Sequence, residues 1–331
     1  MEKRKKHHID LAFESQTSGS EKDPRFSYEP LLSAHPELTN KEFTFLGKSF
    51  NMPFWVSSMT GGTEMAGKIN HNLAKACGEF GFGMGLGSCR IILDDNKYFS
   101  DFDVRDLIGE KYALFANLGI SQIEQHIGKN SLTKIHDLVN RLRADGLIIH
   151  VNPIQEWVQP EGDILSDPPI DTIKRFIEKA NYRVIVKEVG QGMGPESLRA
   201  LLKLPIEAIE FAAFGGTNFA KVELYRRPDH EKDFFAPFAR IGEDAESMVN
   251  AVNAIINDEK DYACRQLIIS GGVKNYLDGY YLLERSKLSA IYGQASAFLR
   301  YAKEGYDELA AFIETQIRGL RMAQAYLRVK E

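Results

Sequence analysis

Short runs of apolar residues recur along the chain and alternate with longer stretches in which apolar residues repeat at helical spacing. Such a continuous apolar run is typical of a strand that is buried on both faces. The runs occupy residues 53–57, 113–118, 184–189, 208–211, 267–270 and 290–293, with a further apolar strand starting at Leu147 and a glycine-rich one before Gly87. Alternating strands and helices predict a parallel sheet, and eight such units would close a (β/α)8 TIM barrel.

Three of the helical stretches carry boundary signals. Residues 131–143 place apolar side chains on one face, with Ser131 as the expected N-cap and Gly146 just beyond the end. Residues 170–177 repeat this pattern, and Pro195 stands where a first helical residue is expected. We interpret these apolar faces as core packing.

The length of the chain, 331 residues, would allow two domains. However, α/β barrels of this size are commonly a single domain, and no linker rich in Ser, Gly and Pro divides the chain. We therefore expect residues 1–50 to form an N-terminal extension and residues 51–331 to form the barrel.

Composition indicates which kinds of ligand the protein could bind and in which compartment we expect it. The formal net charge of −5 argues against a nucleic-acid ligand, which would need a basic face. Cys77, Cys89 and Cys264 are too few and too scattered for a disulfide framework or a zinc site. No apolar stretch has the length of a membrane span or forms a secretory signal. We expect a soluble, cytoplasmic protein that binds small molecules.

Polar residues follow almost every predicted strand, in the sequences MTGG, GSCR, NLG, KEVG, GGTNF and SGG. The most informative run is LIIHVNPIQEWVQPEGD at 147–163. There, His150, Asn152, Gln155 and Glu156 follow the apolar strand before any helix is expected. Because ligands of parallel α/β folds bind beyond the carboxyl ends of the strands, these side chains predict a ligand site.

Two residues have side chains suited to specific chemistry. A single carboxylate such as Glu156 suits Mg²⁺ that is also held by substrate phosphates and water, although a helix-capping role is an equally good interpretation. Lys187 lies near the end of a buried strand, where an ammonium group needs an anion or an electron-rich ligand. An ion pair with Glu188 is the alternative, but alternation along a strand points the two side chains in opposite directions. We therefore predict that Lys187 lies beside a cofactor.

Glycines and N-terminal cations provide candidate phosphate sites. The sequence GFGMGLG at 81–87 fits no dinucleotide-binding frame that is followed by a helix. Other glycines follow the last three predicted strands, where barrels commonly bind phosphate through backbone N–H groups, although each could simply form a turn. These are Gly215, Gly216, Gly271, Gly272 and Gly293. Arg4, Lys5 and His8, with Arg90, would suit a diphosphate, although composition alone indicates a solvated tail.

Taken in order, these motifs resemble those of the type 2 isopentenyl diphosphate isomerases over nearly the whole chain. The similarity rests on RKKHHI, MTGG, GSCR, NLG, HVNPIQE, VKEVGQGM, GGTNF and SGG, and HVNPIQEWVQPEGD is the most specific segment. The resemblance implies a barrel flavoenzyme that interconverts isopentenyl and dimethylallyl diphosphate. It also implies reduced FMN as acid and base, Mg²⁺, NADPH as the reductant of FMN, and a homo-oligomer.

The resemblance also implies roles for residues at matching positions. Lys187, Gln155 and His150 would be catalytic, and Glu156 would bind magnesium. The substrate would be held by Arg4, Lys5, His8, Ser88, Arg90, Asn152, Gln155 and Glu223, so that the N-terminal extension would contribute to the substrate site. FMN would be held by Met59, Thr60, Gly61, Ser88, Asn117, Lys187 and Thr217, and its phosphate by Gly271, Gly272, Gly293 and Ala295.

The chain departs from the family pattern at several positions. Phe219 stands where tryptophan is usual, which keeps an apolar wall but loses the indole N–H donor. Lys274 follows SGGV where arginine is common, and GQAS replaces a more usual GMA at 293–296. The segment 226–246 matches no motif.

The implied reaction, a 1,3 allylic proton shift, must protonate one carbon of an unactivated alkene. Ordinary side chains are poorly matched to that task, because catalysis by an acid depends on a matched pKa and alkenes are very weak bases. Two other functions stay open at this point. One is another FMN-dependent barrel oxidoreductase, related to 2-hydroxy acid oxidases, and the other is a non-catalytic flavin- or phosphate-binding barrel. The diphosphate-binding residues favour the isomerase.

Overall fold

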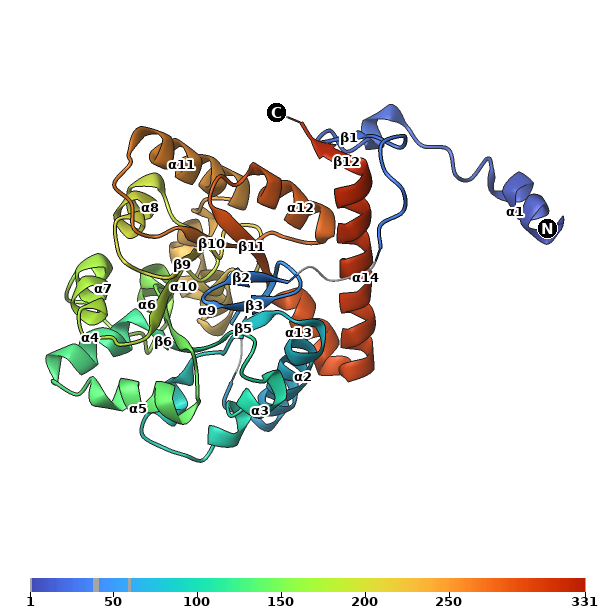
Figure 1. The fold of residues 1–331 in the computed structure, drawn as a ribbon. Helices are drawn as coiled ribbons and strands as arrows, with labels where there is room; N and C mark the ends of the chain where they lie inside the picture. The colour runs from blue at the N-terminus through green and yellow to red at the C-terminus, as the bar shows by residue number, and fades with distance from the viewer. Residues whose placement is uncertain (1, 38–41, 59–60, 331) are drawn as a thin grey trace.

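A computed structural model describes residues 2–37, 42–58 and 61–330. Parallel strands close into a barrel in which each strand pairs with the next one along the chain and the last pairs with the first (Figure 1). The strands are β4 (Phe54–Val56), β5 (Gly83–Gly85), β6 (Leu114–Gly119), β7 (Gly146–His150), β8 (Arg183–Lys187), β9 (Ala208–Glu210), β10 (Gln266–Ser270) and β11 (Ser289–Gln294). The predicted (β/α)8 barrel is confirmed.

Helices connect these strands and surround the barrel (Figure 1). They are α2 (Glu64–Phe80), α3 (Arg105–Ile108), α4 (Ile120–Gly128), α5 (Thr133–Arg141), α6 (Pro153–Val158), α7 (Pro169–Ile177), α8 (Pro195–Leu202), α9 (Phe219–Arg226), α10 (Asp229–Phe235), α11 (Ala245–Asp258), α12 (Tyr276–Arg285), α13 (Ser296–Glu304) and α14 (Tyr306–Tyr326). Short 3-10 helices are η1 (Gly19–Glu21), η2 (Cys89–Ile92), η3 (Phe99–Asp101) and η4 (Ala236–Arg240).

The helix boundaries agree with the sequence at two of the three predicted places. Pro169 and Pro195 begin α7 and α8, as the apolar spacing indicates. The prediction that Ser131 caps the next helix is wrong, because α5 begins at Thr133 without a side-chain cap. The Ser131 hydroxyl instead contacts Nδ1 of His126 at 2.9 Å, which ties it to the end of α4.

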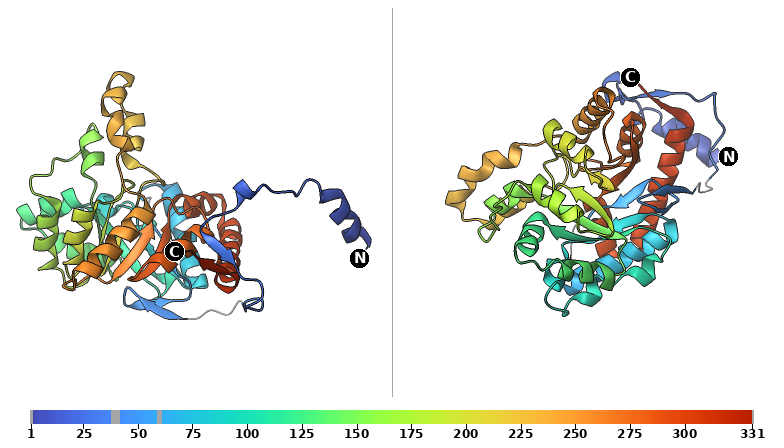
Figure 2. Two further views of the ribbon diagram at one scale, coloured as in Figure 1. Left: turned by 90° about the horizontal axis from the view of Figure 1, so that it is seen from above. Right: turned by 60° about the vertical axis from the view of Figure 1, so that its left-hand side comes forward.

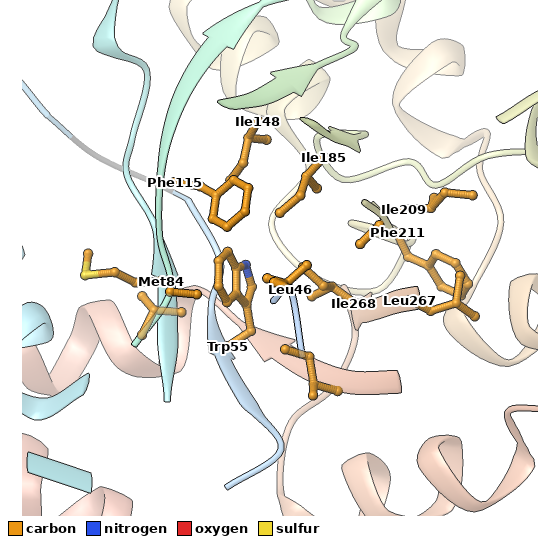
Figure 3. Close-up of a cluster of buried hydrophobic side chains, with 14 of the residues drawn as sticks. Leu46, Trp55, Met84, Phe115, Ile148, Ile185, Ile209, Phe211, Leu267 and Ile268 are labelled. Carbon is orange, nitrogen blue, oxygen red and sulfur yellow. The ribbon is translucent and has the colours of Figure 1, made fainter. Parts of the chain in front are cut away.

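The inside of the barrel is filled by apolar side chains from different strands (Figure 3). Trp55, Phe115, Ile148, Ile185 and Ile268 point toward one another there, and all are essentially inaccessible to solvent. They come from β4, β6, β7, β8 and β10. Because this layer fills the barrel, any ligand must bind above it, at the carboxyl ends of the strands.

A hairpin formed by β2 (Phe43–Phe45) and β3 (Lys48–Phe50) closes the opposite, amino end of the barrel. Leu46, at its turn, is fully buried, and its backbone N–H donates to Gln266 Oε1 at 2.8 Å at the start of β10. Lys48 pairs with Asp145 at 2.9 Å, just before β7. This hairpin belongs to the predicted N-terminal extension. It therefore packs against the end of the barrel that lies opposite the carboxyl ends of the strands.

The first residues of the chain lie apart from the barrel. Strand β1 (Phe26–Tyr28) pairs with β12 (Leu327–Val329) beside α14. Helix α1 (Glu2–Leu11) projects away from the rest of the molecule in Figure 1 and in the left view of Figure 2. Arg4, Lys5 and His8, which it carries, are exposed.

The cysteines limit the chemistry that the protein can perform. Cys77, Cys89 and Cys264 are buried free thiols, and burial raises the pKa of each. None is therefore an activated nucleophile, since thiol reactivity needs a lowered pKa. Among the helices of the described residues, none is both long and apolar enough to cross a membrane.

Candidate active site

A cavity of about 400 Å³ lies at the carboxyl ends of β4 and of β8 to β11. A second cavity of about 130 Å³ lies beside it, over β6 and β7. Both are lined by Ser58, Lys187, Val189 and Phe219. The two cavities therefore meet at Lys187, and together they offer room for a large ligand and a smaller one.

The larger cavity has an end suited to phosphate. Gly271 and Gly272 have left-handed backbone angles, with φ of +89° and +73°, and turn the chain tightly after β10. Helix α13 begins beside them at Ser296, and no side chain caps its first N–H groups. Helix N-termini and such glycine turns bind anions through backbone N–H groups.

Two cations complete this phosphate end. Lys274 and Arg300 line the same cavity and are exposed. Lys274 was identified in the sequence only as a departure from the family pattern, whereas Arg300 was missed. The sequence feature that could have revealed Arg300 is its position one turn into the helix that follows the last strand. The two positive charges line the same cavity as the GQAS segment at 293–296.

Lys187 lies between the two cavities and is 5% exposed. Its Nζ atom donates to the backbone carbonyl of Glu188 at 2.7 Å. The Glu188 carboxylate instead accepts the backbone N–H groups of Gly190, Gln191 and Gly192, at 2.6, 2.6 and 2.9 Å. The alternative of a Lys187–Glu188 ion pair is therefore excluded, and Glu188 orders the loop after β8.

His150 is held as a neutral imidazole. Asn117 donates its Nδ2 to the carbonyl of Leu86 at 3.1 Å, which leaves Asn117 Oδ1 to accept from His150 Nδ1 at 2.8 Å. Burial, followed by the nearby charge of Lys187, lowers the pKa of His150 from 6.5 to about 3. His150 can therefore orient a ligand or another side chain, but it does not act as an imidazolium acid at neutral pH.

This lowered pKa predicts a pH effect on stability. Because His150 stays neutral in the folded state, unfolded chains bind a proton more readily below pH 6.5, and stability falls as the pH drops from 6.5 toward 3. When the pH is lowered from about 7 to 4.5, the free energy of unfolding should therefore fall by about 1–2 kcal/mol less in His150→Gln than in the parent. Urea unfolding at both pH values measures this. The exposed His230→Gln should behave as the parent, and equal pH dependence in all three proteins would contradict the assignment.

The polar residues after β7 form a connected cluster on a short helix. The expectation that His150 to Glu156 precede any helix is wrong, because α6 begins at Pro153 and carries Gln155 and Glu156. Pro153 favours this start, since its missing N–H is not needed at a first helical position. One turn of helix then brings Asn152, Gln155 and Glu156 within hydrogen-bond distance of one another, and Gln155 lines the smaller cavity.

Hydrogen bonds fix the orientation of this cluster. Asn152 Nδ2 donates to Gln155 Oε1 at 3.1 Å and to Glu156 Oε1 at 3.0 Å. Gln155 Nε2 donates to Glu223 Oε1 at 3.1 Å, and Arg226 holds the other Glu223 oxygen. Glu156 Oε2 accepts the backbone N–H of Asp163 at 2.8 Å, beyond the end of α6. Glu156 therefore braces the loop after α6 rather than capping the helix start.

The remaining predicted residues fall into three groups. Ser88 and Asn117 line the smaller cavity, whereas Thr217, Gly271, Gly272, Gly293 and Ala295 line the larger one. Arg90 pairs with Asp163 at 3.2 Å beside the α6 cluster. Gly61 faces the ring of Phe102 and lines neither cavity, and Met59 and Thr60 lie outside the described residues. Arg4, Lys5 and His8 are not brought to the cavities within one chain (Figure 2).

Metal binding by protein side chains alone finds little support in the geometry. Within residues 2–37, 42–58 and 61–330, no group of three or more His, Cys, Asp and Glu side chains could hold a metal ion. The Glu156 carboxylate accepts from Asn152 and from the backbone N–H of Asp163. A magnesium ion there would need ligands from a phosphorylated substrate and water, as predicted from the sequence.

Sequence relatives decide the family of this chain. No protein-family model matches it. The isopentenyl-diphosphate delta-isomerase of Rickettsia felis is 31% identical over 325 residues, which cover 96% of this chain and 90% of that protein. A protein of the same name from Nostoc sp. is 34% identical over 314 residues, which cover 93% and 85%. This chain belongs to the isopentenyl-diphosphate delta-isomerase family.

Solved structures share the fold of this isopentenyl-diphosphate delta-isomerase family member. A flavocytochrome b2 variant with pyruvate bound has a TM-score of 0.62 at 14% identity, covering 91% of this chain and 71% of that chain. A mandelate oxidase variant with an FMN adduct has a TM-score of 0.59 at 12% identity, covering 91% and 82%. At such identities the likeness concerns the fold alone. The family predicted from the motifs is thus confirmed by the sequence relatives, and the barrel by these structures.

Proposed function

We propose that this protein interconverts isopentenyl and dimethylallyl diphosphate by a 1,3 allylic proton shift that uses reduced FMN, as a step of isoprenoid biosynthesis. Membership of the isomerase family over more than nine-tenths of the chain supports this function most directly. The test is an anaerobic assay with isopentenyl diphosphate, the purified protein and chemically reduced FMN. Dimethylallyl diphosphate should form, and it should not form when FMN is left oxidised.

The larger cavity fits FMN. Gly271, Gly272 and the start of α13 would hold the FMN phosphate, with Lys274 and Arg300 neutralising its charge. The isoalloxazine ring would then lie toward Lys187, where the buried hydroxyl of Ser58 has no hydrogen-bond partner among the described residues. When bound in its reduced form, FMN supplies an acid and base suited to an alkene. The ammonium group of Lys187 would stabilise negative charge on the reduced ring.

The smaller cavity would hold the substrate hydrocarbon next to that ring. Phe219 lines both cavities and provides the apolar wall that the family tryptophan would otherwise give, without an N–H donor. An apolar wall excludes water from a developing carbocation. Gln155 lines the same cavity and donates to Glu223, and we propose that its amide would orient the substrate through a hydrogen bond.

The diphosphate would lie toward Ser88, Arg90 and Asn152, with Mg²⁺ on Glu156. Binding this charged group would fix the reacting carbons, so that remote binding energy contributes to catalysis. We also propose that Arg4, Lys5 and His8 reach the diphosphate, by movement of α1 or from a neighbouring copy in a homo-oligomer. The isolated position of α1 supports a contact made beyond its own barrel (Figure 1).

Glu156→Gln tests the magnesium proposal. The substitution keeps the shape of the side chain but removes a charge that a divalent cation requires, so the dissociation constant of the diphosphate substrate should rise at least about tenfold in the presence of Mg²⁺. Titrations of Mg²⁺ at fixed substrate measure this. Glu161→Gln, in the same loop and paired with Arg226, is the matched control. Identical magnesium titrations for the parent and Glu156→Gln would count against the site.

The reductant and the compartment belong to the same proposal. We propose that NADPH reduces bound FMN once and is not consumed in each turnover, because the isomerisation has no net redox change. Three buried free thiols are compatible with a reducing cytoplasm. Comparing NADPH and NADH as the sole reductant in the anaerobic assay tests whether NADPH is the reductant of bound FMN.

A 2-hydroxy acid oxidase activity is the second candidate, since solved barrels with bound pyruvate or an FMN adduct share the fold. The α6 cluster and the paired Arg90 favour a diphosphate substrate instead. Turnover of isopentenyl diphosphate without consumption of oxygen would separate the isomerase from the oxidase.

A further inference from the structure

Arg226 is the first residue of the segment that matches no family motif. It ends α9, which packs against α6, the helix that carries Gln155. Arg226 Nη1 donates to Glu223 Oε2 at 2.6 Å, one turn earlier on the same helix. Its Nη2 donates to Glu161, in the loop after α6. Arg226 therefore joins a residue of the proposed substrate site to a surface loop.

The two ion pairs of Arg226 differ in burial. The side chain of Glu161 is 56% exposed, whereas that of Glu223 is 6% exposed. An exposed ion pair contributes little because water screens it, but a buried carboxylate depends on its charged partner. Among the described residues, only the Gln155 amide donates to Glu223 besides Arg226. The pair with Glu223 is therefore the one whose loss should matter.

The hydrogen bonds that lead from Arg226 to Asn152 run in one direction. A guanidinium only donates and a carboxylate only accepts, so Glu223 accepts from Arg226 at Oε2 and from Gln155 at Oε1. Gln155 must then turn its Nε2 toward Glu223, which leaves its Oε1 to accept from Asn152 Nδ2 at 3.1 Å. A reversed Gln155 amide would set its oxygen against the carboxylate and its NH₂ against that of Asn152. This chain of hydrogen bonds therefore selects one of the two orientations of the Gln155 amide.

The orientation decides which group Gln155 offers to a ligand in the smaller cavity, which it lines. One of its two Nε2 protons goes to Glu223, and Nε2 makes no other hydrogen bond in the part of the chain that the structure describes. The second N–H is therefore available to a ligand. Asn152, which holds the other end of the amide, is 3% exposed, and its Nδ2 also donates to Glu156. The Gln155 amide is thus fixed from both sides.

We propose that Arg226 is a positioning residue for the isomerase site, which acts through Glu223 to hold the Gln155 amide with an N–H group free for the substrate. Arg226 lines neither cavity, so its effect must pass through these side chains. The inference rests on the proposed function, in which Gln155 orients the substrate. The hydrogen bonds themselves exist in the FMN-free protein and can be measured there.

The direct test is Arg226→Met in the FMN-free protein, followed by NMR of ¹⁵Nε2-labelled glutamine. The Gln155 signal is identified by its absence in Gln155→Met. Methionine removes every donor at position 226, so the Nε2 proton that Glu223 accepts should exchange with water at least about tenfold faster. Arg226→Lys restores a charge one turn from Glu223 and should recover most of the protection. Glu161→Gln is the matched control and should exchange as the parent does. Unchanged exchange in a folded Arg226→Met protein would overturn the proposal.

A double-mutant cycle in the FMN-loaded enzyme shows whether Arg226 acts through Glu223. Arg226→Met should lower kcat about 10- to 100-fold with little change in KM, because a misoriented amide affects the reacting carbons rather than the diphosphate. In a Glu223→Gln background, where the amide can donate as well as accept, the same substitution should change kcat less than about twofold. Additive effects would refute the coupling. An equal loss of kcat in Glu161→Gln would also refute it, because Arg226 would then serve only the loop.

Two further outcomes keep the test decisive. If Arg226→Met does not fold, Glu223→Gln interrupts the same chain of hydrogen bonds and should also speed exchange of the Gln155 proton, and unchanged protection there would overturn the proposal. If the parent fails to isomerise the substrate at all, the proposed function is wrong, whereas the exchange measurements on the FMN-free protein still decide the role of Arg226.

Discussion

Replacement of Lys187 by alanine is expected to lower the isomerase kcat about 10²- to 10³-fold when FMN is fully reduced. The ammonium group is buried where the two cavities meet, and its Nζ atom is held by the Glu188 carbonyl at 2.7 Å. Alanine removes the only described cation placed between the two cavities. Because the group acts on charge that develops during the reaction, KM for the diphosphate should change much less than kcat.

Stopped assays with photoreduced FMN under anaerobic conditions measure this effect, and the flavin absorbance at each point confirms that reduction is complete. Lys203→Ala is the control, because Lys203 pairs with Glu259 on the outer helices and should leave turnover unchanged. Unchanged kcat for Lys187→Ala with fully reduced FMN would show that the lysine has no electrostatic role.

Gly271→Ala is expected to have the largest effect on cofactor retention. A methyl group at this position would lie 2.2 Å from the backbone N and O atoms of Ala213, and φ is +89°. The strained backbone costs about 1–2 kcal/mol and the overpacking about 1–3 kcal/mol more, unless the loops after β9 and β10 separate. Such a separation would distort the turn that is proposed to bind the FMN phosphate. We therefore expect both lower stability and weak FMN binding.

Thermal unfolding and fluorescence titration with FMN measure the two effects. Gly194→Ala is a suitable control, because Gly194 precedes α8 with φ of −70° and a methyl group there would meet nothing within 4 Å. It should bind FMN as the parent does. Full FMN affinity in Gly271→Ala would mean that the phosphate lies elsewhere.

The structure shows the surroundings of Phe219 and Lys274, two of the positions that depart from the family pattern. Phe219 keeps an apolar surface at both cavities. Lys274 and Arg300 line the same cavity, so lysine is not the only cation at the proposed phosphate site. The unmatched segment forms α10 and η4, which project from the barrel near α9 in the left view of Figure 2. None of the residues of α10 and η4 lines either of the two cavities.

The sequence predicted the elements whose signals are local. Apolar runs such as 267–270 and 184–189 located the strands because a strand buried on both faces needs side chains of that kind throughout. Pro195 located a helix start because proline is preorganised for it. The Ser131 cap was wrong, because nothing in the local sequence shows that its hydroxyl contacts His126 at the end of the preceding helix.

The sequence by itself determined the barrel, the family, and the strand ends that carry Lys187, His150 and the glycines proposed to bind phosphate. Only the tertiary structure decided which of these side chains meet. Barrel closure brings Arg300 to the same cavity as Gly271, and strand register sets His150 beside Lys187. One turn of α6 turns Gln155 toward Glu223, 68 residues away along the chain. Periodicity and propensity act over a few residues, whereas these contacts depend on how distant strands align, and that alignment is fixed by packing of the whole barrel.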